Sequence, residues 1–377
     1  MGEKELTPAI RFKGFTDPWE QRKLEQISTR VTSIGHDLSL PRIEYEDIVA
    51  RRGELKKEIA KNISLKIGIL FAPGDVLYGK LRPYLMHWLH PQFSGVAVGD
   101  FWVFRPTSTD SSFFYCLIQS EQFQQAAAVS IGSKMPRADW KYVSEFPYLV
   151  PKQIHEQQNI GLLFEGLELY IALHQRKLEK LQRMKQALLE KLFPKNGAVV
   201  PELRFNGFTD AWEQRKLGNI ASLYQPHTIS SDDLLPAGIP VFGANGYIGF
   251  YSEANHWVDQ VTISARGEEA GTPNYVVSPA WITGNSMVVN TDSVEIDKKF
   301  LYFNLCATPL KKFVTGGAQP QLTRSVLGKA EIAVTVIVEE RAISSILGCL
   351  SSLIALHQRK LEKLQQLKSA FLTKMFV

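Results

Sequence analysis

Two segments of this chain each occur twice, and this internal repeat constrains the fold more than any other feature of the sequence. Residues 11–24 read RFKGFTDPWEQRKL and residues 204–217 read RFNGFTDAWEQRKL, so only two positions differ. Residues 171–182 and residues 354–365 both read IALHQRKLEKLQ. Because the copies follow in the same order, each half of the chain is expected to be one variable domain between constant ends.

The regions around the second repeated segment have the pattern of long helices with one apolar stripe. Apolar residues and one histidine recur at alternating spacings of three and four residues, which is the seam of a coiled coil. A polar residue in such a seam fixes the register of pairing. The predicted seam contains Leu167, Ile171, His174, Leu178 and Leu181 in the first copy and Leu350, Ile354, His357, Leu361 and Leu364 in the second.

A helix with a single apolar stripe requires a partner, and each of these helices has its own copy in the same chain. Two equivalent units pack with pseudo-twofold symmetry, which would lay the two helices antiparallel as a spacer between the domains. The alternative is that both helices are core elements of ordinary α/β domains. The narrow stripe and the heavily charged opposite faces favour the paired helices.

The two stretches between the repeated segments differ in sequence but share a texture. Aromatic and β-branched residues alternate with polar ones, and the turns are rich in Gly, Pro and Asn, as in curved, mostly antiparallel sheets. The predicted fold class is α/β (α+β), with two mixed α/β domains separated by an antiparallel two-helix coiled-coil spacer in a pseudo-twofold internal repeat. The predicted parts are residues 1–150 (first domain), 151–195 (central helix), 196–337 (second domain) and 338–377 (distal helix).

Composition and motifs argue against an enzyme. The three cysteines, Cys116, Cys306 and Cys349, lie far apart without a C-x-x-C pair, which argues against a zinc site or disulfide framework and fits a reducing cytoplasm. The sequence contains neither a phosphate-binding glycine loop nor histidines at metal-ligand spacing. It also lacks the apolar stretch of a secretory signal or a membrane span. We therefore expect a cytoplasmic protein with no metal, no membrane contact and no catalytic residues.

Each variable stretch ends in a glycine loop, GSKMPRAD at residues 132–139 and GGAQPQLT at residues 316–323. Constant frames around divergent inserts suit a protein that presents two readers to one ligand, such as an asymmetric two-part DNA site. Arg and Lys bind guanine or phosphate, whereas Asn and Gln match adenine. The alternative at each position is that the side chain is simply solvated and makes no contact with DNA. The candidate contacts to double-stranded DNA are Lys80, Arg82, Lys134, Arg137, Arg266, Asn274, Gln319, Gln321 and Arg324.

The paired GFTD-x-WEQRKL segments, the paired LHQRKLEKLQ helices and the TGGAQPQLT loop resemble the specificity subunits of type I restriction-modification systems. The resemblance covers essentially the whole chain. It implies that each variable domain is a target-recognition domain for one half of a split DNA sequence and that the paired helices set the gap between the halves. It also implies that two modification (methyltransferase) subunits dock on the repeated frames and that restriction (endonuclease and translocase) subunits join them. S-adenosylmethionine, ATP and Mg would then belong to those partners, and this chain would bind no cofactor.

One stretch departs from the family pattern, in which the strand before each helix often ends in PPL-x-EQ. The first copy here reads VPKQIHEQQNI and the second reads VTVIVEERAI, so the second frame is expected to be degenerate at Glu339, Glu340 and Arg341, with unequal docking of the two partners. Two other classes of protein remain as alternatives. One is a structural coiled-coil scaffold without DNA recognition, and the other is a free-standing methyltransferase or nuclease.

Overall fold

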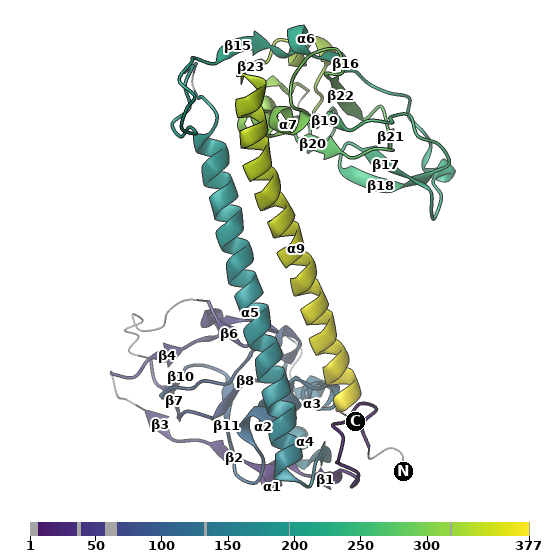
Figure 1. The fold of residues 1–377 in the computed structure, drawn as a ribbon. Coiled ribbons are helices and arrows are strands. Elements are labelled where there is room, and N and C mark those ends of the chain that lie inside the picture. Colours follow the sequence, from purple (N-terminus) through teal and green to yellow (C-terminus); the bar gives the residue numbers. More distant parts are fainter. Residues whose placement is uncertain are drawn as a thin grey trace. The chain divides into compact units, whose positions relative to one another are not determined.

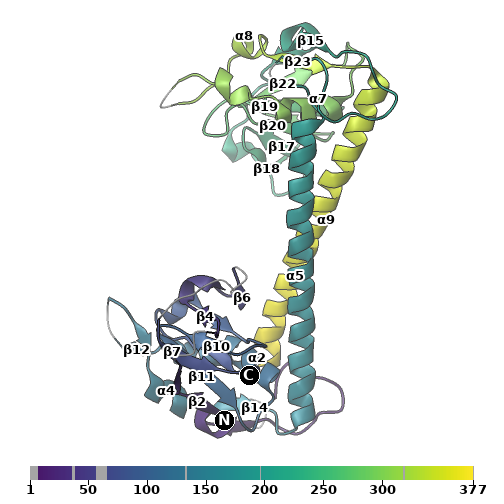
Figure 2. The same cartoon turned by 90° about the vertical axis from the view of Figure 1, so that its left-hand side faces the viewer.

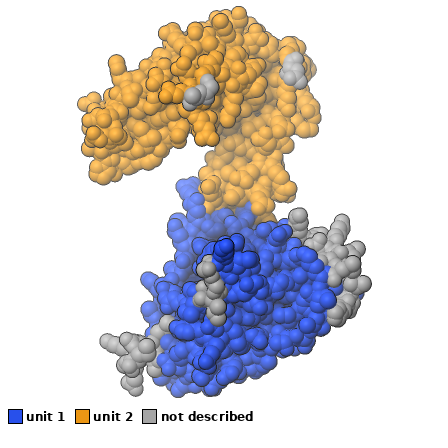
Figure 3. All heavy atoms as spheres, turned by 180° about the vertical axis from the view of Figure 1, so that it is seen from behind, with its two compact units in different colours: residues 1–175, 359–377 blue, residues 176–358 orange. Residues whose placement is uncertain are grey.

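The computed structural model has the mixed α/β class expected, with one long helix in each repeated frame (Figure 1). It describes residues 7–35, 39–56, 66–131, 134–195, 197–316 and 319–376. The chain divides into two compact units, residues 1–175 with 359–377 and residues 176–358 (Figure 3). Both divisions fall inside a long helix, so each unit contains a segment of both helices.

The first unit is built on a four-stranded antiparallel sheet in the order β2-β11-β8-β9. A second sheet has the order β3-β7-β10-β4, in which only β10 and β4 are parallel. The strands are β2 (Ser28–Val31), β3 (Ile34–Gly35), β4 (Arg42–Ile43), β7 (Gly68–Phe71), β8 (Val76–Gly79), β9 (Trp88–Leu89), β10 (Gly95–Ala97) and β11 (Phe101–Pro106). Smaller pairs in this unit are β5 (Ile48–Val49) with β6 (Glu54–Leu55), and β12 (Ser130–Ile131) with β13 (Arg137–Ala138).

Helices α2 (Ser111–Gln119) and α3 (Glu121–Ala128) and the short α4 (Trp140–Glu145) complete the first unit. The carboxylate of Asp110 begins α2 by accepting a hydrogen bond from the Phe113 N–H at 3.0 Å. Phe104 of β11 and Phe113 of α2 are fully buried in one core, which therefore lies between the sheet and the helices.

The second unit repeats the topology of the main sheet with different residues. Its main sheet has the order β16-β22-β19-β20 and is antiparallel throughout. A three-stranded sheet has the order β18-β17-β21, and helix α7 (Lys298–Ala307) packs on β19 and β20. The strands are β16 (Ser222–Tyr224), β17 (Ile239–Gly243), β18 (Gly246–Tyr251), β19 (Gln260–Ser264), β20 (Pro273–Val276), β21 (Trp281–Ile282) and β22 (Ser286–Asn290). Position by position in the main sheet, β2, β11, β8 and β9 correspond to β16, β22, β19 and β20.

The repeated GFTD-x-WEQRKL segments occupy the same place in both units. Each supplies a strand that pairs antiparallel with the strand just before a long helix, and each then turns into a short helix. The elements are β1 (Glu20–Arg22), β14 (Tyr148–Val150) and α1 (Leu24–Ile27) in the first unit, and β15 (Glu213–Lys216), β23 (Glu331–Val334) and α6 (Leu217–Ile220) in the second.

The two long helices, α5 (Ile154–Lys191) and α9 (Ile337–Met375), carry the predicted seam. Leu167, Ile171, Leu181, Leu350 and His357 are buried. The other predicted positions are half-buried, namely His174, Leu178, Ile354, Leu361 and Leu364. The spacing of three and four residues therefore identified the packed face of both helices.

Within the first unit, the helix segments run antiparallel. Phe164 of α5 packs with Phe376, and four residues further along α5 the Glu168 Oε1 atom accepts a hydrogen bond from Lys368 Nζ at 2.7 Å. Residue numbers that rise along α5 therefore meet residue numbers that fall along α9, as in an antiparallel pair of helices. The C-terminal end of the chain consequently lies in the core of the first unit, beside Trp19 (Figure 2).

Candidate nucleic-acid interface

In the first unit, the residues that follow β8 lie against the first glycine loop. The Arg82 N–H donates to the Pro136 carbonyl at 2.7 Å, and Leu81 forms an antiparallel bridge with Arg137. This pairing brings the first unit's four sequence candidates into two neighbouring segments, Lys80 and Arg82 in one and the exposed Lys134 and Arg137 in the other.

A carboxylate that the sequence did not indicate lies among these cations. The Asp100 Oδ2 atom accepts hydrogen bonds from Arg137 Nε at 3.1 Å and Arg137 Nη2 at 2.8 Å, and Oδ1 lies 3.6 Å from Lys80 Nζ. The hydrogen bonds from Arg137, aided by Lys80, hold the pKa of Asp100 below its ordinary value. The loop sequence itself has no carboxylate before Asp139, and the acidic partner comes from Asp100, just before β11.

A half-buried tyrosine connects the segments that carry these charges. The Tyr45 hydroxyl, in the 3₁₀ turn Tyr45–Asp47, donates to the Asp100 carbonyl at 2.6 Å and accepts from the Leu81 N–H at 3.0 Å. Burial raises the pKa of Tyr45 well above its ordinary value, so the hydroxyl stays protonated. A Cβ atom at Gly79 would come within 2.8 Å of the Tyr45 ring, which explains glycine at that position. The cluster is therefore rigidly connected to the sheet.

The second glycine loop makes the same contacts in the second unit. The Gly267 N–H donates to the Pro320 carbonyl at 3.0 Å, and Arg266 forms an antiparallel bridge with Gln321. Arg266, Gln319 and Gln321 are exposed here and are brought together by this pairing.

Two further candidates of the second unit lie on other elements. Asn274 is half-buried on the edge strand β20, and its Nδ2 atom is 3.4 Å from both Ser264 Oγ and the Thr272 carbonyl. Arg324 is exposed and begins the short helix α8 (Arg324–Leu327), which follows the loop. The loop and strand ends thus carry most, but not all, of the residues that the sequence suggested.

Each repeated frame contains a buried ion pair between its two ends. In the first frame, Arg11 Nε and Nη2 donate to the Glu156 carboxylate at 2.6 and 2.8 Å, and Trp19 Nε1 donates to the same carboxylate at 3.2 Å. Glu156 is 1% exposed. Arg11 begins a repeated segment, whereas Glu156 lies at the start of α5, ahead of the other repeated segment.

The second frame has the same ion pair. Arg204 Nε and Nη2 donate to the Glu339 carboxylate at 2.8 and 2.9 Å, and Thr335 Oγ1 donates to Glu339 Oε2 at 2.6 Å. Glu339 is 0% exposed. The expectation of a degenerate second frame was therefore wrong at Glu339, because this residue occupies the place of Glu156.

The two frames do differ at the next position. The Gln157 side-chain carbonyl accepts from the Asp110 N–H at 2.8 Å, and the Glu340 carboxylate accepts from the Asp297 N–H at 2.9 Å. Asp110 and Asp297 each begin a helix, α2 and α7 respectively. The same connection between a long helix and a helix start is thus made by a neutral amide in one frame and by an ionisable carboxyl in the other.

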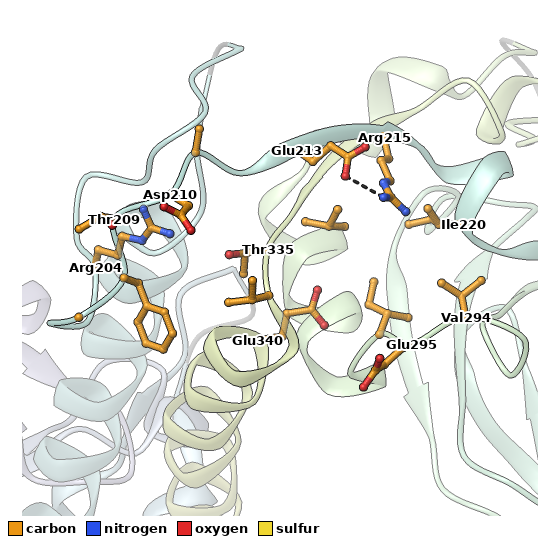
Figure 4. Close-up of a pocket in the computed structure, with 16 residues that line it drawn as sticks. Arg204, Thr209, Asp210, Glu213, Arg215, Ile220, Val294, Glu295, Thr335 and Glu340 are labelled. Atoms are coloured by element: carbon orange, nitrogen blue, oxygen red, sulfur yellow. Dashed lines mark hydrogen bonds and ion pairs between the residues drawn. The ribbon is translucent and has the colours of Figure 1, made fainter.

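Burial makes Glu340 unusual among the acidic residues of this chain. Its loss of hydration, together with the nearby Asp297 and Glu295 charges, raises the pKa of Glu340 to about 7. A cavity of about 360 Å³ next to Glu340 is also lined by Glu295 and Thr335 (Figure 4). Arg341, the third residue of the stretch, is exposed.

Known proteins resemble this chain in sequence and in fold. Residues 209–366 match the model of a family described as the type I restriction modification DNA specificity domain. A crystal structure of the S subunit of a type I restriction-modification system from M. genitalium has a TM-score of 0.76 at 15% identity, over 98% of this chain and 99% of that chain. No curated protein matches the chain.

Two further solved structures are also similar. One is the HsdS subunit from Thermoanaerobacter tengcongensis, at 19% identity and a TM-score of 0.42 over 95% of this chain and 93% of that chain. The other, at 18% identity and a TM-score of 0.49 over 96% of this chain and 95% of that chain, comes from work on complex assembly and conformational transition of the type I restriction-modification system.

The second unit thus contains most of a type I restriction modification DNA specificity domain, and the main sheet of the first unit has the same strand arrangement. Over 98% of its length, the chain has the fold of the S subunit from M. genitalium. Among the described residues, no group of His, Cys, Asp and Glu side chains could hold a metal ion. No helix within the described part of the chain is long and apolar enough to cross a membrane.

Proposed function

We propose that this chain is a specificity subunit of a type I restriction-modification system and reads an asymmetric DNA sequence in two halves, one half for each unit. The observation that carries the proposal is the pair of glycine loops, which make the same backbone contacts in both units but present different side chains. Arg137 in the first unit corresponds to Gln321 in the second, because each forms the antiparallel bridge with the segment after the third strand of its sheet. The same backbone contacts with different side chains are what two domains that recognise different sequences require.

The sequence readout is tested by the methylation pattern that this chain directs. When the chain is expressed with its modification subunits in a host that lacks other methyltransferases, sequencing of methylated DNA should give one motif with two separated halves. The same host without this chain should lack the motif. Methylation that does not depend on the chain would contradict the proposal and would favour the coiled-coil scaffold.

Catalysis in the proposed complex belongs to other chains. Methyl transfer and DNA cleavage are assigned to the modification and restriction subunits, which would hold S-adenosylmethionine, ATP and Mg. This chain would contribute sequence recognition and the placement of those subunits. The absence of a methyltransferase or motor motif from the sequence supports this division.

An exposed apolar stripe on α5 supports docking of a modification subunit. Leu162, Leu169, Tyr170 and Leu173 are 65%, 71%, 58% and 55% exposed. On a helix, residues 162 and 169 lie about opposite the seam residues Phe164 and Ile171, because two positions correspond to roughly 200° of rotation. Leu169, Tyr170 and Leu173 lie within about one helical turn, and a group of apolar side chains that faces solvent indicates an interaction surface. We assign it to an apolar helix or groove of the modification subunit.

Replacing Leu169 and Leu173 together by glutamate is expected to abolish co-purification with the modification subunit. Two charges in an apolar contact remove the burial of two leucine side chains, which corresponds to a loss in affinity of roughly a hundred-fold or more. The measurement is pull-down and size-exclusion chromatography of the co-expressed chains. Gln182→Glu, which adds a charge at an exposed position of α5 outside the stripe, should leave the complex intact. Wild-type affinity in the double variant would exclude this surface.

A further inference from the structure

The two glycine loops can be compared residue by residue, because the backbone hydrogen bonds around them are the same. The Lys80 N–H donates to the Asp100 carbonyl and the Ala138 N–H to the Lys80 carbonyl, both at 2.9 Å. In the second unit, the Ala265 N–H donates to the Asn285 carbonyl at 2.9 Å and the Leu322 N–H to the Ala265 carbonyl at 2.8 Å. Lys80, Asp100 and Arg137 therefore correspond to Ala265, Asn285 and Gln321.

Arg137 is held in a defined orientation with one edge available. Its Nε and Nη2 atoms donate one hydrogen bond each to Asp100 Oδ2. A guanidinium carries five N–H donors in a fixed fork, so the two on Nη1 and the second one on Nη2 remain. No other acceptor for this side chain occurs among the described residues, and the side chain is 49% exposed. The remaining edge has the paired donors that match guanine O6 and N7.

The Asp100 carboxylate also distinguishes a base from a phosphate as the ligand of Arg137. Phosphate is an anion, and its approach to Arg137 would place it next to the Asp100 negative charge. Guanine O6 and N7 are neutral acceptors and do not meet this repulsion. The ion pair thus favours a base edge over the DNA backbone, while the Tyr45 hydrogen bond to the Asp100 carbonyl holds the carboxylate-bearing turn in place.

The second unit presents amides where the first presents charges. Asn285 and Gln321 are both exposed, and Ala265 replaces the Lys80 side chain. The side-chain amide of glutamine presents an NH2 group, which donates to adenine N7, and a carbonyl oxygen, which accepts from adenine N6, in the major groove. The same backbone position is therefore occupied by the side chain suited to guanine in one unit and by the side chain suited to adenine in the other.

We propose that residues 137 and 321 are equivalent specificity-determining positions, where Arg137, positioned by Asp100, reads a guanine of one half-site and Gln321 reads an adenine of the other. The inference rests on the proposed function, since it assumes that each unit reads one half-site. Asp100 acts through Arg137 and is a positioning residue.

The test exchanges the two side chains in the full complex with its modification subunits. First, the wild-type motif is read from methylated DNA. Binding is then measured on duplexes that carry each of the four bases at every position of the motif. Arg137→Gln should reverse the preference from guanine to adenine at one position of one half-site. Gln321→Arg should reverse adenine to guanine at one position of the other half-site.

Asp100→Asn distinguishes the positioning of Arg137 by Asp100 from the recognition of guanine by Arg137. It should lower the preference for guanine at the Arg137 position roughly ten-fold, the order expected when a bidentate contact loses its geometry, without changing the preferred base. Arg137→Lys should retain guanine with a weaker preference. A matched control is Arg105→Gln, which removes another arginine–aspartate contact of the same unit, between Asp75 and Arg105 at the other end of β11. Arg105→Gln should leave every base preference unchanged.

The readout is a ratio of affinities, so a variant that binds weakly still gives a result. Unchanged ratios in both exchange variants would overturn the inference, as would an equal loss on all four bases, which would indicate a phosphate contact. A wild-type complex that yields no chain-dependent split motif would instead refute the proposed function. The two failures are therefore distinguishable.

Discussion

Glu339→Ala is expected to destabilise the second unit by about 3–5 kcal/mol, the range for removing one partner of a buried ion pair. Glu339 is 0% exposed and accepts two hydrogen bonds from Arg204, which is itself 12% exposed. Without the carboxylate, the guanidinium would remain largely buried without a counter-charge, and the Thr335 hydroxyl would lose its acceptor. Chemical denaturation of the purified chain, monitored by circular dichroism, measures the change in the free energy of unfolding.

Glu213→Ala is the matched control for this substitution. Glu213 pairs with Arg215 at 2.7 Å in the same frame, but the two side chains are 63% and 45% exposed. An exposed pair contributes roughly 0–1 kcal/mol, so the control should unfold close to the wild type. Equal losses in the two variants would mean that burial of the Arg204–Glu339 pair is not what stabilises the frame.

Glu340→Gln should make the stability of the second unit less dependent on pH. Glu340 is 2% exposed, and its pKa is about 7 in the folded chain against an ordinary value of 4.5. A raised pKa means that the folded state binds the proton more tightly than the unfolded state does. The stabilising contribution is therefore complete below pH 4.5 and is lost as the pH rises through 7. At pH 8 the variant should be more stable than the wild type by about 3 kcal/mol.

The first unit supplies the reciprocal experiment. Gln157 makes the corresponding contact to the start of α2 and is 3% exposed, so Gln157→Glu should introduce a similar pH dependence there. The measurement is the unfolding free energy of the wild type and both variants between pH 5 and 8, which shows whether residues 157 and 340 make stability depend on pH. Parallel curves for the wild type and Glu340→Gln would show that Glu340 does not titrate in this range.

Much of the architecture could be predicted because it is written twice in the sequence. The three-four spacing identified the packed face of α5 and α9, including the buried Leu167 and His357. The repeated segments also located the frames, and the two glycine loops occupy equivalent places as expected. The comparison with the PPL-x-EQ pattern nevertheless misjudged Glu339. The surrounding residues depart from that pattern, but Glu339 pairs with Arg204 as Glu156 pairs with Arg11.

The candidate site was less predictable, because its decisive contacts join residues far apart in the chain. Asp100 and Arg137 are separated by 37 positions, and nothing in the sequence near Asp100 marks it as a partner. Tyr45 lies still further away and acts through backbone groups, which carry no sequence pattern. The correspondence of Asp100 with Asn285 depends on hydrogen bonds of the sheet, since the surrounding sequences differ.

The composition of the first unit has a consequence for synthesis of the chain. Its core includes Met375 and Phe376, which pack with Trp19 and Phe164. The ribosome must therefore synthesise the chain through Phe376 before the first unit can close, although N-terminal domains usually fold first during translation. Until then, the apolar surface of α5 that receives Phe376 stays uncovered. Protection by chaperones during elongation, and rapid proteolysis of incomplete translation products, would follow from this order of assembly.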